Sequence, residues 1–277
     1  MGENAPISVP VDIRFTLAPI VILALLAYAG VYIARWRRVR RTIGPRGAPY
    51  GRLVLWLGGV ALIAVALLSP LDHLGEQFAT AHMVQHLLLA DLAPILLILG
   101  LTKVLLRPVT RRVQAIERRA GPLGHPAAGV VAYVGFMWLW HVPALYDAAV
   151  SDPVVHVLEH VSFAGAGFLY WWHLISPIRS RLRLTGMGPI IYMAATKVLV
   201  GFLGVLLAFA PSRLFDAYGT GEDRRWGLTL TDDQHVAGLV MGLEQSIVMG
   251  IGLAYLFARM LTESEQEEQR AERYADA

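Results

Sequence analysis

Two pairs of histidines have the spacing that places two imidazoles on one face of a helix. His82 and His86 are four residues apart in the segment HMVQHLLLADLAPILLILG, and His156 and His160 have the same spacing in HVLEH. Side chains four residues apart are neighbours on a helix surface. Neutral imidazole is a common protein ligand for zinc, copper, iron and nickel. The two pairs therefore predict a metal or haem site.

Two further histidines stand at the ends of apolar segments. His141 ends one such segment just before Pro143, and His235 opens another. Several imidazoles buried at one depth of a membrane cost free energy, so they are expected to have a function such as binding a ligand. Met83 and Met137 lie nearby in the sequence; a thioether beside imidazole suits Cu(I), although methionine also serves as ordinary core filler. We expect the metal ligands to come from six histidines: His82, His86, His141, His156, His160 and His235.

The segment His156-Val157-Leu158-Glu159-His160 also has the HxxEH pattern of one class of zinc protease. In that reading Glu159 would activate a water molecule on zinc. In the other reading, Glu159 orients a ligand histidine or lowers the charge of a bound cation. We favour the second, because the pattern opens an apolar segment and lacks the hydrophilic domain of those proteases.

Three ionisable residues, Asp91, Lys197 and Glu244, fall near the middle of apolar segments. Such residues are costly in lipid and usually face one another. They form either a buried ion pair or triad that locks helices together, or a relay for protons or ions. Asp91 is nine residues from His82, about 180° around a helix at ~100° per residue. Either the helix is kinked, for which Pro94 is suitable, or Asp91 belongs to a different cluster from the imidazoles.

The composition indicates a polytopic membrane protein of the all-α class. Of the 277 residues 56% are hydrophobic and 16% charged, and the mean hydropathy is +0.52; soluble domains average about 25% charged residues. The chain has no cysteine, which excludes disulfides and thiolate metal sites. We expect one transmembrane domain over residues 1–260 and an acidic cytoplasmic tail over 261–277.

Seven apolar segments are each near the ~17–25 residues that cross a bilayer. We predict transmembrane helices at residues 15–34, 53–69, 82–106, 128–145, 154–175, 189–210 and 234–258. Arginines follow the first, third and fifth segments (Arg179, Arg181 and Arg183 after the fifth), whereas connections 70–81 and 146–153 contain no lysine or arginine. By the positive-inside rule the N-terminus lies outside and the C-terminus in the cytoplasm. No basic region precedes the first segment, so we expect it to remain as a helix and not to be a cleaved signal peptide.

Several of these segments together resemble a known family. HMVQHLLLADLAPILLILG, WLWHVPALYDAAV, HVLEHVSFAGAGFLYWWHLI and DDQHVAGLVMG are similar to the multi-spanning CtaG family of assembly factors for caa-type cytochrome c oxidase. The resemblance covers the third to seventh segments. It implies a seven-helix protein of the bacterial plasma membrane that is needed to make active oxidase and has a role in copper supply or insertion.

The family motifs map onto individual residues. HMxQH corresponds to His82 and His86, HxPxLYD to 141–147, and HxxEH to 156–160. The final D-Q-x-x-A-G element corresponds to Asp233, Gln234, Ala237 and Gly238. The chain departs from the family pattern at His173, where a proline is expected after two tryptophans, and after Met241, where Gly-Leu-Glu244 replaces an expected aromatic residue.

These observations together predict a non-enzymatic assembly factor. An outward-facing imidazole cluster would bind copper transiently, with His82, His86, His156 and His160 as its first ligands, and would help deliver it to a cytochrome c oxidase subunit. A membrane haem protein, an intramembrane zinc hydrolase and a plain copper transporter remain as alternatives. We expect the oxidase and the lipid bilayer as partners and no nucleic acid, and leave a homodimer open.

Overall fold

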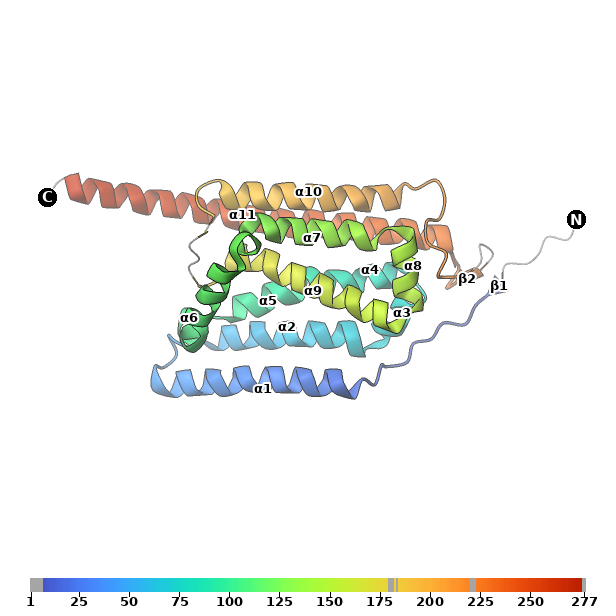
Figure 1. Cartoon of the computed structure of the whole chain (residues 1–277), viewed down its shortest axis with the longest axis horizontal. Helices are drawn as coiled ribbons and strands as arrows, with labels where there is room; N and C mark the ends of the chain where they lie inside the picture. Colours follow the sequence, from blue (N-terminus) through green and yellow to red (C-terminus); the bar gives the residue numbers. More distant parts are fainter. Residues whose placement is uncertain (1–6, 179–181, 183, 220–222, 276–277) are drawn as a thin grey trace, which may run out of the picture.

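The computed structural model describes residues 7–178, 182, 184–219 and 223–275, and almost all of them are helical. Figure 1 shows the long helices side by side in a bundle. These are α1 (Pro19–Thr42), α2 (Tyr50–Leu68), α7 (Pro126–Trp140), α9 (Pro153–Ile175), α10 (Gly188–Ala208) and α11 (Leu230–Ala275). The shorter ones are α3 (Pro70–Gly75), α4 (Ala79–Leu87), the π-helix η1 (Leu88–Leu92), α5 (Ala93–Gly100), α6 (Lys103–Ala120), the 3₁₀-helix η2 (Gly121–Gly124) and α8 (Pro143–Ser151).

A small sheet joins the N-terminal segment to the last long loop. Its strands β1 (Ile7–Ser8), β2 (Asp223–Arg225) and β3 (Leu228–Thr229) lie in the order β1-β2-β3. β1 pairs in parallel with β2, and β2 pairs antiparallel with β3. The all-α prediction is confirmed, since this sheet involves only seven residues.

Five helical stretches of the described chain are long and apolar enough to cross a membrane: α1, α2, Ala79–Gly100 (α4 to α5), α10 and α11. A sixth results if α7 and α8, bent by 79° at their junction, count as one. α9 is 23 residues long and carries His156, Glu159 and His160; it is not among these stretches. The chain is therefore a helical membrane protein, and the count of seven spans stays a prediction.

Two of the expected spans end earlier than predicted. The segment expected at 82–106 ends at Gly100, and the segment expected at 128–145 ends at Trp140. Thr102 starts a new helix, because its hydroxyl accepts a hydrogen bond from the Leu105 N–H at 3.1 Å. Pro143 likewise stands at the start of α8, where its missing N–H costs nothing. In Figure 1, α6 and α8 therefore lie across opposite ends of the bundle.

The helix that carries the first histidine pair is interrupted by a π-helical turn, and Asp91 lies within that turn. The break covers Leu88–Leu92, before Pro94, and the Ala93 N–H bonds to the Leu88 carbonyl five residues back. A π-turn adds one residue to the helical repeat and so rotates the side chains after it around the helix axis. The irregularity therefore lies just before Pro94, which stands in the first turn of the regular helix α5.

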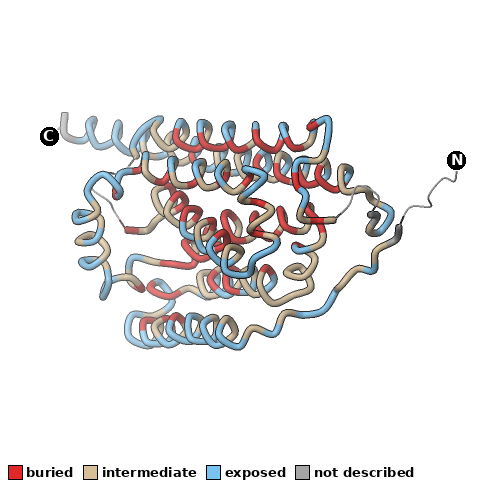
Figure 2. Tube along the Cα trace, turned by 45° about the vertical axis from the view of Figure 1, so that its right-hand side comes forward, coloured by how far each residue is buried: buried red, intermediate tan, exposed pale blue. Residues whose placement is uncertain are grey.

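The α4–η1–α5 stretch forms the centre of the bundle. Of its most apolar stretch 67% is buried, against 11% for α1. Figure 2 shows buried positions concentrated on the inner helices, whereas α1 and the C-terminal end of the chain are mostly exposed. α11 continues as one helix through the acidic tail to Ala275 and extends beyond the bundle (Figure 1).

α9 approaches this central stretch closely at Gly167. A Cβ added to Gly167 would overlap the carbonyl group of Ala90 in η1. The close approach brings one face of α9 against α4 and η1, and that face carries the buried residues Glu159, Phe163, Gly167 and Trp171. Only glycine permits this contact, so Gly167 sets how near α9 lies to the helix with His82 and His86.

We predict that Gly167→Ala lowers the melting temperature of the purified protein, because the new methyl group must separate α9 from η1; overpacking of this kind costs about 1–3 kcal/mol. The matched control is Gly165→Ala, two residues away on the same helix, where an added Cβ meets nothing within 4 Å. Equal melting temperatures for the two variants would show that the close approach at Gly167 does not exist.

Candidate metal centre

A distant carboxylate fixes the start of α4, the helix that carries His82 and His86. Phe78 provides no side-chain cap for the helix. Instead Asp233 of α11 accepts hydrogen bonds from the backbone N–H groups of Ala79 at 2.6 Å and Thr80 at 3.2 Å. A carboxylate at this position also stabilises the positive end of the helix dipole. α11 therefore holds the first turn of α4 in register with the bundle.

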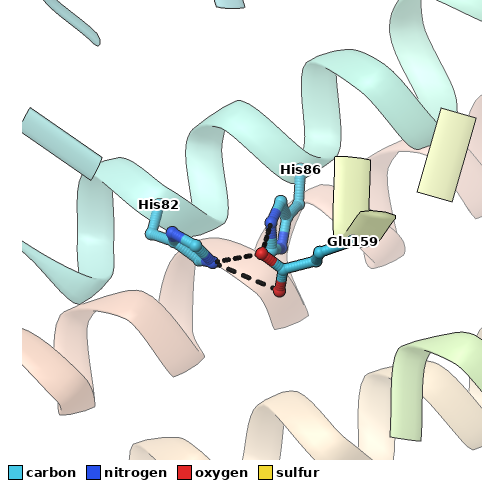
Figure 3. A group of neighbouring side chains, drawn as sticks. All are labelled: His82, His86 and Glu159. Atoms are coloured by element: carbon cyan, nitrogen blue, oxygen red, sulfur yellow. Dashed lines mark hydrogen bonds and ion pairs between the residues drawn. The ribbon is translucent and has the colours of Figure 1, made fainter. Parts of the chain in front are cut away.

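Both histidines of α4 face Glu159 of α9 (Figure 3). Nε2 of His82 lies 3.3 Å from Oε2 and 3.4 Å from Oε1 of the carboxylate, and Nε2 of His86 lies 3.5 Å from Oε2. The three residues are buried. In the described part of the chain, no lysine or arginine forms an ion pair with Glu159. Its buried negative charge is thus surrounded by imidazoles alone.

The second histidine pair continues the cluster along α9. The ring of His156 stacks against His82 at a centroid distance of 5.7 Å, and the ring of His160 meets His86 edge-on at 5.6 Å. Within each pair the rings are 4.2 Å apart on α4 and 4.1 Å apart on α9. The structure therefore brings four of the six predicted histidines together around one carboxylate. His156 is the half-buried member of the four.

The donor atoms of this cluster fit a metal ion. His82, His86 and Glu159 each offer a ligand atom within 4.8 Å of the others, and so do His156, Glu159 and His160. Neighbouring ligand atoms around a four-coordinate ion with bonds of ~2.0–2.2 Å are about 3.3–3.5 Å apart, which matches the separations of 3.3 and 3.5 Å between Nε2 and Oε2.

Buried polar atoms without hydrogen-bond partners support the same conclusion. They include Nδ1 of His82, both ring nitrogens of His86, Nε2 of His156, Nε2 of His160 and Oε2 of Glu159. An unpartnered buried polar atom costs about 1–3 kcal/mol. An ion could satisfy at most one nitrogen of each ring together with Oε2 of Glu159.

The other two predicted ligands lie apart from this group. His141 ends α7; its Nδ1 lies 2.6 Å from the Met137 carbonyl and its Nε2 3.4 Å from Sδ of Met83. Nε2 of His235 lies 2.9 Å from the Ala210 carbonyl, a backbone contact. His141 is therefore next to the cluster through α4, whereas His235 is tied to the loop after α10.

Tyr146 of α8 packs against the cluster at His82. Its ring lies 5.0 Å from His82, and its hydroxyl is 2.8 Å from that of Tyr218. Phe215 stacks on its other face at 3.7 Å. Burial raises the pKa of Tyr218 well above its usual value, so this phenol keeps its proton. Two residues of the loop between α10 and α11, Phe215 and Tyr218, thus hold Tyr146 beside the imidazoles.

The predicted mid-membrane charges form a second, separate cluster. Nζ of Lys197 donates to Oδ1 of Asp91 at 2.8 Å. The same carboxylate accepts hydrogen bonds from Tyr133 at 2.5 Å, Trp171 at 2.7 Å and Gln245 at 3.2 Å. Trp171 is twelve residues from Glu159 on α9, or about 18 Å at 1.5 Å per residue. Asp91 therefore belongs to a different site from the imidazoles.

Glu244 joins this second cluster through its neighbour Gln245 and through a direct side-chain hydrogen bond with Asp91. Nε2 of Gln245 donates to Glu244 at 2.6 Å and also reaches Asp91. The saturated hydrogen bonding of Asp91 indicates a structural lock between η1, α7, α9, α10 and α11. Sequence reasoning missed Tyr133, Trp171 and Gln245, since buried aromatic and amide groups have no distinctive spacing.

Comparison with known proteins places the chain in a family. The family model described as cytochrome c oxidase caa3 assembly factor (Caa3_CtaG) matches residues 30–263. The chain belongs to this family. The match includes both histidine pairs, Glu159 and the mid-membrane cluster. The resemblance inferred from the histidine motifs is thereby confirmed, and membership in an oxidase-assembly family favours a role without catalysis.

The curated relatives are longer proteins. An uncharacterized protein of Mycobacterium leprae is 24% identical over 266 residues, covering 89% of this chain and 39% of that protein. Uncharacterized proteins of Mycobacterium bovis and Mycobacterium tuberculosis are each 26% identical over 275 residues, covering 92% of this chain and 41% of theirs. The chain thus spans about two fifths of the length of these relatives. No solved structure matches it.

We predict that Lys197→Met strongly lowers the thermal stability of the protein in detergent, because it leaves the buried Asp91 carboxylate without its cation; breaking such a pair costs about 3–5 kcal/mol. The double variant Asp91→Asn/Lys197→Met should lose less, since it removes both charges. Lys103→Met, at an exposed position of α6, is the control. A single variant as stable as the double would contradict a structural ion pair.

Proposed function

We propose that this protein binds copper at the cluster of His82, His86, Glu159, His156 and His160 and passes it to cytochrome c oxidase during assembly. The observation that carries the proposal is the buried Glu159 carboxylate, whose ion-pairing partners in the described chain are two imidazoles. A buried charge without a cation is costly. Imidazole and carboxylate together suit a transition metal ion, and the family's role in oxidase assembly favours copper over zinc.

The arrangement is suited to transient binding. Glu159 belongs to both groups of potential ligands, one with the α4 pair and one with the α9 pair. A copper ion can therefore exchange histidines while it keeps the carboxylate. His156, the half-buried member, offers the entry and exit point. Copper is cargo in this account, so the protein needs no catalytic residue.

We further propose seven membrane spans, namely the five apolar stretches together with α7 and α9. α9 runs through the bundle beside α7 and α5 (Figure 1), and its polar face is turned to the buried cluster. Other helices therefore shield its polar residues from lipid. The arginine-rich connections then place the N-terminus outside, the C-terminus in the cytoplasm and the copper cluster near the outer face. Arg179, Arg181 and Arg183 lie outside the described residues.

Because the chain has no cysteine, this orientation can be tested with single introduced thiols. We predict that Ser151→Cys, in the exposed turn between α8 and α9, reacts with a membrane-impermeant maleimide in intact cells. Thr42→Cys, at the exposed end of α1, and Ser264→Cys, in the tail, should react only after the membrane is opened. The opposite pattern would reverse the orientation, and reaction of all three in intact cells would refute the topology.

For the site itself, we predict that purified protein loaded with Cu²⁺ and desalted retains about one ion per chain, and that Glu159→Gln abolishes this retention because it removes the charge that holds the ion. His73→Ala, a histidine of α3 outside the cluster, is the control and should retain copper fully. Copper is counted by mass spectrometry, with zinc counted and the haem Soret band recorded on the same sample.

The functional arm of this test uses cells. Oxidase activity and the copper content of the oxidase should fall in cells that carry Glu159→Gln and remain normal with His73→Ala. Equal copper retention by wild type and Glu159→Gln would remove the cluster as a copper site. A Soret band lost with the histidines would instead assign the cluster to haem.

A further inference from the structure

A second pair of metal-binding atoms lies beside the carboxylate cluster. Nε2 of His141, at the end of α7, is 3.4 Å from the thioether Sδ of Met83 on α4. Both residues are buried. Met83 follows His82 directly, so it points to a neighbouring face of α4, about 100° away around the helix. The pair is therefore close to the cluster but separate from it.

The hydrogen bond on the other side of the ring decides what His141 presents to Met83. Nδ1 lies 2.6 Å from the Met137 carbonyl, which can only accept a hydrogen bond. Nδ1 therefore carries the proton of the neutral ring, and Nε2 keeps a lone pair. The Met83 thioether has no hydrogen to donate. Two lone-pair atoms thus face each other without a proton between them.

The ring is also held in this orientation. The backbone N–H of His141 bonds to the Trp138 carbonyl, which fixes the turn that ends α7. Tyr146 lies 6.0 Å from the imidazole, and its hydroxyl is engaged with Tyr218. A carbonyl that fixes the tautomer and aim of an imidazole is a usual companion of a metal-ligand histidine.

We propose that Met83 and His141 form a binding site for a soft monovalent cation of the Cu(I) class, distinct from the Glu159 cluster. The proposal rests on the proposed function only in that both sites would take the same cargo. A thioether with a neutral imidazole selects soft ions, whereas carboxylate with imidazole suits harder divalent ions such as Zn²⁺ and Cu²⁺.

The separation of the two atoms fits one shared ion. An ion about 2.0 Å from nitrogen and 2.3 Å from sulfur would see them at an angle of about 105° when they are 3.4 Å apart. Such an angle leaves further coordination positions open. A soft ion held by two protein ligands can therefore exchange onto a third ligand without leaving the protein.

The test is metal titration of the purified full-length chain in detergent with two probes, Ag⁺ as a redox-inert soft ion and Zn²⁺ as a divalent ion. We expect Met83→Leu to bind about one Ag⁺ fewer than wild type and the same amount of Zn²⁺. The swap of methionine for leucine usually costs less than ~1.5 kcal/mol, and a thermal melt checks the fold. Met193→Leu, an equally buried methionine of α10, is the matched control and should bind both ions as wild type does.

Two further results separate this site from the cluster. Glu159→Gln should lose Zn²⁺ and keep the Ag⁺ that depends on Met83, and the sulfur neighbour in the X-ray absorption spectrum of the Cu(I) form should disappear in Met83→Leu. Unchanged Ag⁺ binding by Met83→Leu would overturn the Met83–His141 site, and so would an equal loss in Met193→Leu. Loss of Zn²⁺ in Glu159→Gln would still support the cluster in either case, so the two proposals fail independently.

Discussion

The histidine-bearing half of this bundle depends on one interaction, the approach of the buried Glu159 carboxylate to the imidazoles of His82 and His86. A carboxylate at this depth cannot remain charged at low cost without a cation. The imidazoles satisfy it only in part. Oε2 of Glu159 has no hydrogen-bond partner, and several ring nitrogens also lack one. The cluster therefore combines a high density of ligand atoms with an unmet need for positive charge, which is the condition of a site that acquires a metal ion.

The rest of the fold keeps these groups in place. Gly167 allows α9 to lie against η1, and Asp233 holds the start of α4 from the far end of the sequence. The π-helical turn lets one continuous helix present His82 and His86 to Glu159 and, further along, Asp91 to Lys197. The hydrogen bonds of Asp91 link five helical elements, which are η1, α7, α9, α10 and α11. The polar groups that link the helices, around Asp91, thus differ from the groups proposed to bind metal, around Glu159, although both lie on the same helices.

Much of this could be inferred from the sequence, and the exceptions have physical causes. Helical spacing predicts that His82 pairs with His86 and His156 with His160, because periodicity is a local property. That Glu159 reaches the α4 pair depends on how two helices dock, which the spacing within either helix does not determine. The π-turn was missed because Leu88–Leu92 has an ordinary apolar sequence, and only Pro94 hinted at irregularity. Asp233 as a cap for α4 depends on a contact across 154 positions of sequence. His235 satisfied every sequence criterion, yet it bonds to a loop carbonyl.

The most direct test of the central claim is to locate the ion. Crystals of the copper-loaded protein, measured at the copper absorption edge, should show an anomalous peak within bonding distance of the Glu159 carboxylate and of Nε2 of His82 or His86. A fully loaded protein whose copper lies only at His235 or at surface residues, with no peak beside Glu159, would contradict the account. The buried carboxylate would then have to be explained without metal.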